Sequence, residues 1–207
     1  MKKIFLCSSF KDVASLFDTF VGADVSGKKI TFIPTASLTE KVKFYVGAGR
    51  KCLEKRGFII DELEVSTASV EEITMKLQVN DFIYVTGGNT FFLLQELKKA
   101  GADKLIKEQI SAGKIYIGES AGAMILSPNI EYVTEMDSLK HTPDLQDFSG
   151  LGLVDFYTVP HYTNFPFIKS TEKILFKYQE TLQLRPISNI QAICVENENA
   201  KIVTSKT

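Results

Sequence analysis

The sequence has no long apolar run, no excess of charge and few cysteines. Its 207 residues carry a formal net charge of -1, so neither nucleic acid nor an anionic membrane is an expected partner. No stretch approaches the about 18 apolar residues of a membrane span. The N-terminal apolar run stops at Ser8, so we interpret it as a strand and not as a signal peptide. We therefore expect a soluble protein that acts on small molecules or peptides.

The cysteines Cys7, Cys52 and Cys194 are odd in number and widely spaced. Each lies in an apolar pattern, which is typical of reduced, buried thiols in the cytoplasm. A zinc site is not expected. The sequence also lacks both glycine-rich phosphate-binding patterns, Gly-x-Gly-x-x-Gly and Gly-x-x-x-x-Gly-Lys-Ser/Thr. We therefore expect a cytoplasmic protein that uses no metal and no cofactor.

Short β-branched and aromatic runs alternate with helical patterns along the chain. This alternation predicts an α/β fold, with a doubly wound, mostly parallel sheet and helices on both faces. We expect one domain over residues 1–207, because the length fits a single core and no repeat or linker interrupts the pattern. The expected strands cover residues 3–7, 30–33, 58–60, 82–85, 115–117, 156–159 and 190–195, with 202–203 as a last short candidate.

Residues 114–122 read Lys-Ile-Tyr-Ile-Gly-Glu-Ser-Ala-Gly, a strand that runs into the pattern Gly-x-Ser-x-Gly and then into an apolar segment that can begin a helix. Such a turn brings backbone close to Gly118 and Gly122 and presents Ser120 at the carboxyl end of the strand. An ordinary turn containing serine is the alternative, because the pattern also occurs by chance. The strand and helix around it favour a nucleophile elbow, with Ser120 as nucleophile and the Ala121 amide as an oxyanion donor.

A serine hydroxyl is a weak nucleophile and needs a positioned base, and the sequence has two histidines. His161 closes the expected strand 156–159 and is braced by Pro160, which stiffens its presentation. His141 lies in a polar loop. We interpret His161 as the base and His141 as a solvated surface residue; a structural histidine at a strand end is the alternative for His161.

Three carboxylates compete to orient the base. Glu196 directly follows the strand 190–195, so we expect it at the same sheet edge as the serine and the histidine. Asp137 and Glu135 lie in the long irregular stretch 127–155 and can fold back over the site. We prefer Glu196 because strand ends are rigid, with Asp137 second and Glu135 third. A carboxylate beside the histidine predicts a pKa near neutrality for the base.

The strand 82–85 ends in Thr-Gly-Gly-Asn-Thr, a turn that leads into a helical pattern. Two consecutive glycines let a ligand approach the backbone closely, and Asn89 or Thr90 can cap the helix. We expect the Gly88 amide to be the second oxyanion donor. Asn89 is a candidate for binding the substrate.

Together these motifs resemble the peptidase E (aspartyl dipeptidase) family of serine peptidases, whose sibling group is cyanophycinase. The resemblance rests on Thr-Gly-Gly-Asn-Thr-Phe at 86–91, Tyr-Ile-Gly-Glu-Ser-Ala-Gly-Ala at 116–123, Ser-Pro at 127–128 and Pro-His-Tyr at 160–162. It implies a fold related to class I glutamine amidotransferases, with serine in place of their cysteine. It also implies Ser120 as nucleophile, His161 as base, Gly88 and Ala121 as oxyanion donors, and Glu196 as acid, while a loop aspartate proposed for the family maps near Glu135 or Asp137.

One departure from the family concerns specificity. Aspartyl dipeptidases resemble one another in an arginine-containing segment after the base, where a guanidinium can bind the substrate aspartate. Residues 163–180 contain no arginine, and Lys169 and Lys173 are nearby cations that fix a carboxylate less well. We therefore expect weaker selection for N-terminal aspartate.

The sequence as a whole predicts a serine peptidase that cleaves short peptides through an acyl-enzyme. One alternative is an esterase or amidase that acts on a small metabolite. Another is a catalytically silent binding protein on the same scaffold. A homodimer is left open.

Overall fold

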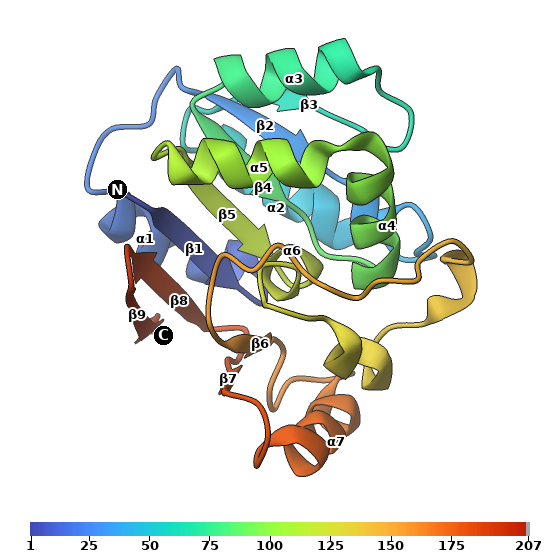
Figure 1. Ribbon diagram of the computed structural model, residues 1–207. Coiled ribbons are helices and arrows are strands. Elements are labelled where there is room, and N and C mark those ends of the chain that lie inside the picture. The colour runs from blue at the N-terminus through green and yellow to red at the C-terminus, as the bar shows by residue number, and fades with distance from the viewer. Residues whose placement is uncertain (206–207) are drawn as a thin grey trace.

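A computed structural model describes residues 1–205 and is built around a seven-stranded sheet of order β3-β2-β4-β5-β1-β8-β9 (Figure 1). The first five strands in this order pair in parallel, whereas β8 runs antiparallel to both β1 and β9. The predicted α/β fold with a mostly parallel sheet is confirmed. The strands are β1 (Lys3–Cys7), β2 (Lys29–Ile33), β3 (Ile59–Glu62), β4 (Phe82–Val85), β5 (Ile115–Glu119), β8 (Gln191–Glu196) and β9 (Asn199–Thr204).

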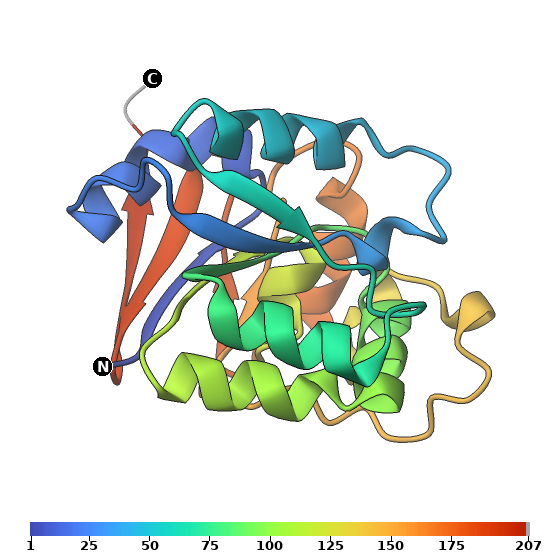
Figure 2. The same cartoon turned by 90° about the horizontal axis from the view of Figure 1, so that it is seen from above.

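Helices cover both faces of this sheet, as Figure 2 shows from above. On one face lie α1 (Phe10–Val21) and α2 (Phe44–Glu54); on the other lie α3 (Val70–Val79), α4 (Thr90–Ala100) and α5 (Ala102–Ser111). Successive side chains of β1 enter different cores: Ile4 and Leu6 join the cluster under α3 to α5, while Phe5 and Cys7 join the cluster under α1 and α2. Strands buried on both faces explain the continuous apolar runs. None of the helices in residues 1–205 is long and apolar enough to cross a membrane.

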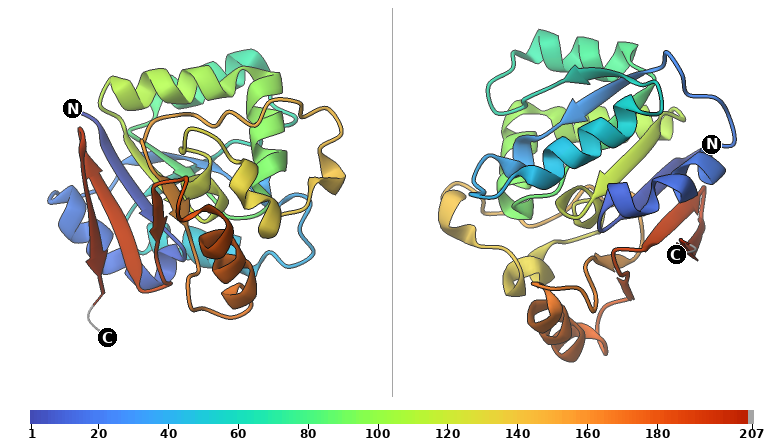
Figure 3. Two further views of the ribbon diagram at one scale, coloured as in Figure 1. Left: turned by 60° about the horizontal axis from the view of Figure 1, so that its bottom comes forward. Right: turned by 180° about the vertical axis from the view of Figure 1, so that it is seen from behind.

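A second, smaller sheet lies beside the main one and consists of β6 (Tyr157–Val159) paired in parallel with β7 (Leu184–Pro186). Helix α7 (Ile168–Tyr178) connects these strands and packs against the 3-10 helix η2 (Glu131–Glu135), as the left view of Figure 3 shows. The sequence predicts a strand where β6 lies, but β6 pairs outside the main sheet. Its partner β7 was not predicted, because its three residues include an arginine and a proline.

The long stretch between β5 and β6 contains little regular structure. It begins with the short helix α6 (Ala121–Met124) and continues through η2 and a second 3-10 helix, η3 (Leu139–His141). In Figure 1 this segment runs in yellow and orange past the carboxyl ends of β4 and β5. The predicted irregular loop therefore lies over the edge of the sheet where a ligand of a parallel sheet is expected.

Candidate active site

The elbow begins where β5 ends. Ser120 has φ 49° and ψ -104°, a backbone conformation that is strained for a residue with a side chain. Its amide donates a hydrogen bond of 2.8 Å to the Cys7 carbonyl at the end of β1. Helix α6 begins at the next residue. This sharp, strained turn from strand to helix is the geometry of a nucleophile elbow.

Two glycines make the elbow possible. A Cβ atom on Gly118 would clash with the carbonyl oxygen of Gly122, and a Cβ atom on Gly122 would clash with the carbonyl oxygen of Val85 on β4. The contacts are with backbone atoms, which cannot move aside as a flexible side chain could. Both positions therefore require glycine, for the reason that the sequence pattern indicates.

His161 lies directly beside the serine. Its Nε2 atom is 3.0 Å from Ser120 Oγ. The His161 amide donates to Ser8 Oγ at 2.9 Å, and the imidazole stacks on Phe167 with ring centroids 4.5 Å apart. These contacts hold both the backbone of His161 and the face of its ring. The imidazole is therefore positioned to accept the serine proton.

The other ring nitrogen of His161 meets an amide and not a carboxylate. His161 Nδ1 lies 2.8 Å from Asn189 Oδ1. The backbone N–H of Asn189 donates a hydrogen bond of 2.8 Å to Asn164 Oδ1. Because an amide oxygen only accepts, Nδ1 carries the proton and Nε2 is left free to accept from Ser120. The arrangement is Ser-His-Asn, comparable with the Cys-His-Asn group of papain-like proteases. Asn189 was not singled out from the sequence.

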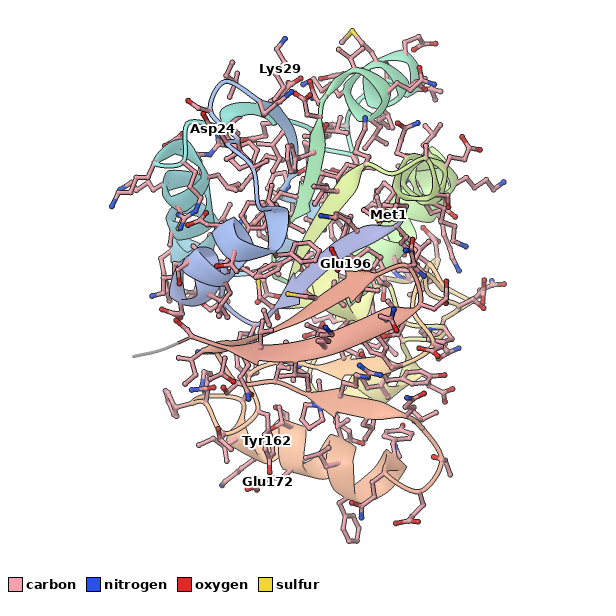
Figure 4. The ribbon with its side chains drawn as sticks, turned by 90° about the vertical axis from the view of Figure 1, so that its left-hand side faces the viewer. Met1, Asp24, Lys29, Tyr162, Glu172 and Glu196 are labelled. Carbon is pink, nitrogen blue, oxygen red and sulfur yellow. The ribbon has the colours of Figure 1, made fainter. Side chains whose placement is uncertain are left out.

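Glu196 lies at the end of the strands that is opposite to the serine. Strand β8 runs antiparallel to β1, so its amino end, next to Asn189, is at the serine, and its carboxyl end is remote from it. Glu196 is paired in register with Lys3 at the start of β1 and forms an exposed ion pair with it at 3.5 Å. Figure 4 shows Glu196 near Met1 and away from Tyr162, the neighbour of His161. The prediction that Glu196 emerges beside the serine is wrong.

The two loop carboxylates also bind elsewhere. Asp137 Oδ2 accepts a hydrogen bond of 2.7 Å from the Thr90 amide, and Glu135 forms an ion pair of 3.2 Å with Lys177. Within residues 1–205 neither carboxylate hydrogen-bonds to His161. Burial raises the pKa of Asp137 to about 6. Asp137 lines the cavity at the serine, whereas Glu135 is not among its lining residues.

Burial also decides the protonation of the base. It lowers the pKa of His161 below its usual value, and the hydrogen bond that Nδ1 donates to Asn189 Oδ1 offsets this only in part. No carboxylate pairs with the imidazole in the described part of the chain. The expectation of a pKa near neutrality, set by a carboxylate, is therefore replaced by a lower pKa. His161 is neutral, and able to act as a base, at pH 7.

Two backbone amides at the site have no partner. Neither the Gly88 nor the Ala121 amide donates a hydrogen bond to any residue that the structure describes. Gly88 has φ 135°, and a Cβ atom there would clash with the Ala36 carbonyl, so glycine is required. Ala121 follows the serine in the chain, and Gly88 lies on the β4–α4 turn and lines the same cavity as Ser120. This is where donors to an oxyanion are needed.

Both polar atoms of the Asn89 side chain form hydrogen bonds with the protein backbone. Its Oδ1 accepts from the Phe92 amide at 2.9 Å and caps α4, and its Nδ2 donates to the Ser138 carbonyl at 2.8 Å. Asn89 thus caps the predicted helix and anchors the long loop. Although Asn89 lines the cavity, both ends of its side chain are already bonded.

Glu119, the residue before the serine, is a buried acidic side chain that was not predicted from the sequence. Its Oε1 accepts from the Phe10 amide at the start of α1, and its Oε2 accepts from the Tyr84 hydroxyl on β4, at 2.9 and 2.7 Å. Burial raises its pKa to about 7. Glu119 therefore ties the nucleophile strand to a neighbouring strand and to a helix N-terminus.

A cavity of about 580 Å³ opens at the serine. Phe44 and Phe165 stand on its lining with 72% and 90% of their surface exposed. The cationic side chains on its lining are Lys11 and Lys140, with His141 beside them. His141 was predicted to be a solvated residue; it is exposed, but it faces this cavity. The volume is within the about 300–1,000 Å³ of small-ligand sites.

We expect Asn189→Ala to lower kcat/KM on the order of 10²-fold, because the imidazole loses the partner that selects its tautomer.

Asn189→Asp should instead raise the pKa of His161, since a carboxylate stabilises the imidazolium. The base acts when neutral, so labelling by a fluorophosphonate should rise with pH through a pKa below about 6.5 in the wild type. In Asn189→Asp this rise should move upward by about one to three pH units.

Glu196→Gln is the matched control for Asn189, because it removes a carboxylate at the carboxyl end of β8, whereas Asn189 precedes the amino end of that strand. Its rate and its pH profile should equal those of the wild type. Glu119 and Asp137 also titrate near this range, but Asn189→Asp changes neither. An unmoved profile in Asn189→Asp would contradict the assignment of the rise to His161.

Comparisons with known proteins agree with this geometry. The model of peptidase family S51 matches residues 4–203. The chain is 60% identical over 198 residues to the uncharacterized peptidase PM1590 of Pasteurella multocida, which covers 96% of this chain and 95% of that protein. It is 34% identical over 145 residues to peptidase E of Nostoc sp., covering 70% of this chain and 56% of that protein.

The fold has a close match among solved structures. A crystal structure of a protein provisionally named peptidase E, from Listeria monocytogenes, superposes with a TM-score of 0.96 at 55% identity, and each chain is covered completely. The likeness therefore extends over the main sheet, the β6–β7 pair and the elbow.

Proposed function

Because the chain belongs to peptidase family S51 and is a serine-type peptidase, we propose that it hydrolyses short peptides through an acyl-enzyme on Ser120. The observation that carries this proposal is the 3.0 Å approach of Ser120 Oγ to His161 Nε2, on a strained elbow. The base is fixed by Asn189 and by the Phe167 ring. A binding protein without activity would have no need to keep this geometry.

In the acylation step, Ser120 Oγ attacks the scissile carbonyl carbon while its proton passes to His161 Nε2. The carbonyl π electrons move to the oxygen, which accepts hydrogen bonds from the Gly88 and Ala121 amides. The imidazolium then protonates the leaving amine as the C–N bond breaks. Asn189 holds the ring but carries no charge, so the oxyanion donors supply the electrostatic stabilisation.

Deacylation repeats the same proton path with water. His161 Nε2 takes a proton from the water that attacks the ester carbonyl, and it returns that proton to Ser120 Oγ as the ester bond breaks. Both amides bind the second oxyanion. The described residues thus account for every proton in the cycle.

Short peptides are the substrates that the cavity suits best. The long loop contributes Met136 and Ser138 to its lining, and the segment after His161 contributes Phe167. Its volume of about 580 Å³ fits a ligand of a few residues. The exposed Phe44 and Phe165 offer apolar surface for the side chain of the leaving residue.

A set of dipeptides tests selection for an acidic first residue. Lys169 and Lys173 are exposed on α7 and do not line the cavity, whereas Lys11 and Lys140 do. An exposed lysine stabilises a carboxylate by up to about 1 kcal/mol, so we expect Asp-Leu to be preferred over Asn-Leu by about fivefold at most.

The variants decide which cations act. Lys140→Gln and Lys11→Gln should weaken that preference, and Lys169→Gln should leave it unchanged. A preference of 10³-fold, or one abolished by Lys169→Gln, would show that the acidic side chain binds elsewhere. Failure of the wild type to cleave any of the dipeptides, while a fluorophosphonate still labels it, would overturn the peptidase proposal in favour of an esterase.

We also propose a cytoplasmic location, supported by the cysteines. Cys7, Cys52 and Cys194 are all free in the structure. Burial raises the pKa of each, to about 11 for Cys194, so the thiols are protonated and poor in reactivity at neutral pH. Three unpaired, unreactive thiols suit a reducing compartment.

A further inference from the structure

The serine and its base are carried by different sheets. Ser120 follows β5 of the main sheet, whereas His161 follows β6 and Asn189 follows β7 of the smaller sheet. Within residues 1–205, no strand of one sheet pairs with a strand of the other. The 3.0 Å distance between Ser120 Oγ and His161 Nε2 therefore depends on contacts that join the two sheets.

Ser8, which directly follows β1, makes such a contact with its hydroxyl group. Its Oγ atom accepts the 2.9 Å hydrogen bond from the His161 amide. The same hydroxyl donates toward the carbonyl oxygens of Ile187 and Ser188, at 3.1 and 3.2 Å. Only 2% of the residue is exposed, so water does not compete for these bonds. One side chain thus binds both the base and the segment that leads to Asn189.

The backbone on either side of Ser8 holds the nucleophile. The Cys7 carbonyl accepts a hydrogen bond of 2.8 Å from the Ser120 amide. Glu119, which directly precedes that serine, accepts from the Phe10 amide at 2.9 Å. The turn from β1 to α1 is therefore fixed to the elbow both before and after Ser8, which makes it a rigid reference for the position of the base.

The backbone of His161 needs this support. Its φ of 62° lies in the left-handed region, which residues with a side chain adopt at a cost and keep where their surroundings hold them. The next amide, that of Tyr162, donates at 3.0 Å to the Ile187 carbonyl, the same oxygen that Ser8 reaches. The His161 amide itself has no acceptor besides Ser8 among the described residues. Loss of the hydroxyl would therefore let this backbone relax, and the ring would move with it.

We propose that Ser8 is a positioning residue that sets the distance and the angle between the His161 ring and Ser120. The proposal rests on the serine peptidase function proposed above. Ser8 Oγ bonds to neither Ser120 Oγ nor a ring nitrogen of His161, so it takes no part in the proton path. Ser8→Ala should lower kcat by about ten- to a hundredfold, since a misplaced base slows the proton transfer. Although Ser8 lines the cavity, little of it is exposed to a substrate, so KM should stay within about twofold.

The test is a double-mutant cycle on kcat with the best dipeptide substrate, in which Ser8→Ala is made in the wild type and in His161→Gln. In the wild type we expect the full loss. In His161→Gln the same substitution should cost less than about twofold, because the group that Ser8 positions is no longer there. The rate at which a fluorophosphonate labels Ser120 should follow the same pattern. If Ser8→Ala does not fold, Ser8→Cys tests the same bonds, because a thiol is only a weak donor and acceptor.

Thr31→Val is the matched control for the loss of a buried hydroxyl. Thr31 Oγ1 donates to the Lys76 carbonyl and accepts from Asn80 Nδ2, both at 2.9 Å, and Thr31 does not line the cavity. This variant should lower the melting temperature as Ser8→Ala does, and it should leave kcat within about twofold of the wild type.

Three results would overturn the role of Ser8: an unchanged kcat in Ser8→Ala, an equal loss in the wild type and in His161→Gln, or an equal loss in Thr31→Val. Failure of the proposed function has a different signature, which is a wild type that the fluorophosphonate labels but that cleaves no dipeptide. In that case the labelling rates of the same variants still decide whether Ser8 positions the base.

Discussion

Ser120→Ala should lower kcat/KM for dipeptide hydrolysis by about 10⁴-fold or more. The substitution removes the one hydroxyl that lies 3.0 Å from His161 Nε2, and with it the covalent intermediate. Residual turnover would come from the two oxyanion amides, which the substitution leaves in place. Steady-state kinetics with the best dipeptide, at equal protein concentration, measure the loss.

A neighbouring serine provides the control for Ser120. Ser138→Ala removes another hydroxyl from the same cavity, but that hydroxyl accepts from the Lys140 amide and does not touch the imidazole. Activity within about twofold of the wild type is expected. If Ser120→Ala kept a tenth or more of the activity, the elbow would not be the source of the nucleophile.

His161→Gln should cost about 10³- to 10⁴-fold in kcat/KM, because Ser120 loses the group that accepts its proton. A second effect accompanies this loss, since glutamine cannot span both Ser120 and Asn189 as the ring does. The loss should be in kcat more than in KM, because the proton transfer belongs to the transition state. Single-turnover kinetics at several protein concentrations separate the rate of the chemical step from the binding of the dipeptide.

The second histidine gives the matching control. His141→Gln removes an imidazole from the same cavity, but His141 is exposed and makes no hydrogen bond to the serine. It should lower activity less than about tenfold. Equal losses in the two variants would mean that the ring nitrogen nearest the serine is not the base.

The elbow could be predicted from the sequence, because its motif is a contiguous run of residues between a strand pattern and a helix pattern. Gly118 and Gly122 are needed where β5 turns into α6, and the motif places Ser120 between them. The mostly parallel α/β fold follows from apolar runs that are buried on both faces. The resemblance to the peptidase E family, carried by four motifs in order, is confirmed by the match to peptidase family S51.

The direction of β8 could not be predicted in the same way. An apolar run is the same in either direction, and no local feature of residues 190–195 shows that the strand runs against β1. Because of this reversal, the partner of His161 is Asn189, which precedes the strand, and not Glu196, which ends it. The sequence held one partial signal for antiparallel last strands. Asn197 is of a residue type that tolerates positive φ, and it has φ 54° in the turn of the β8–β9 hairpin.

The position of the base was predicted for a partly wrong reason. His161 follows a strand, but β6 belongs to the smaller sheet, and the histidine reaches the serine through its bond to Ser8 at the end of β1. The burial of Glu119 and Asp137 was also beyond the sequence, because it depends on packing between α1, β4, α4 and the long loop. These contacts are tertiary and leave no periodic pattern.

The central claim is that Ser120 is an activated nucleophile, and the mass of the intact protein after exposure to a fluorophosphonate tests it most directly. The account predicts that the wild type gains the mass of one phosphonyl group, that peptide mapping places the group on Ser120, and that Ser120→Ala gains none. An unmodified wild type, or labelling that persists in Ser120→Ala, would contradict it.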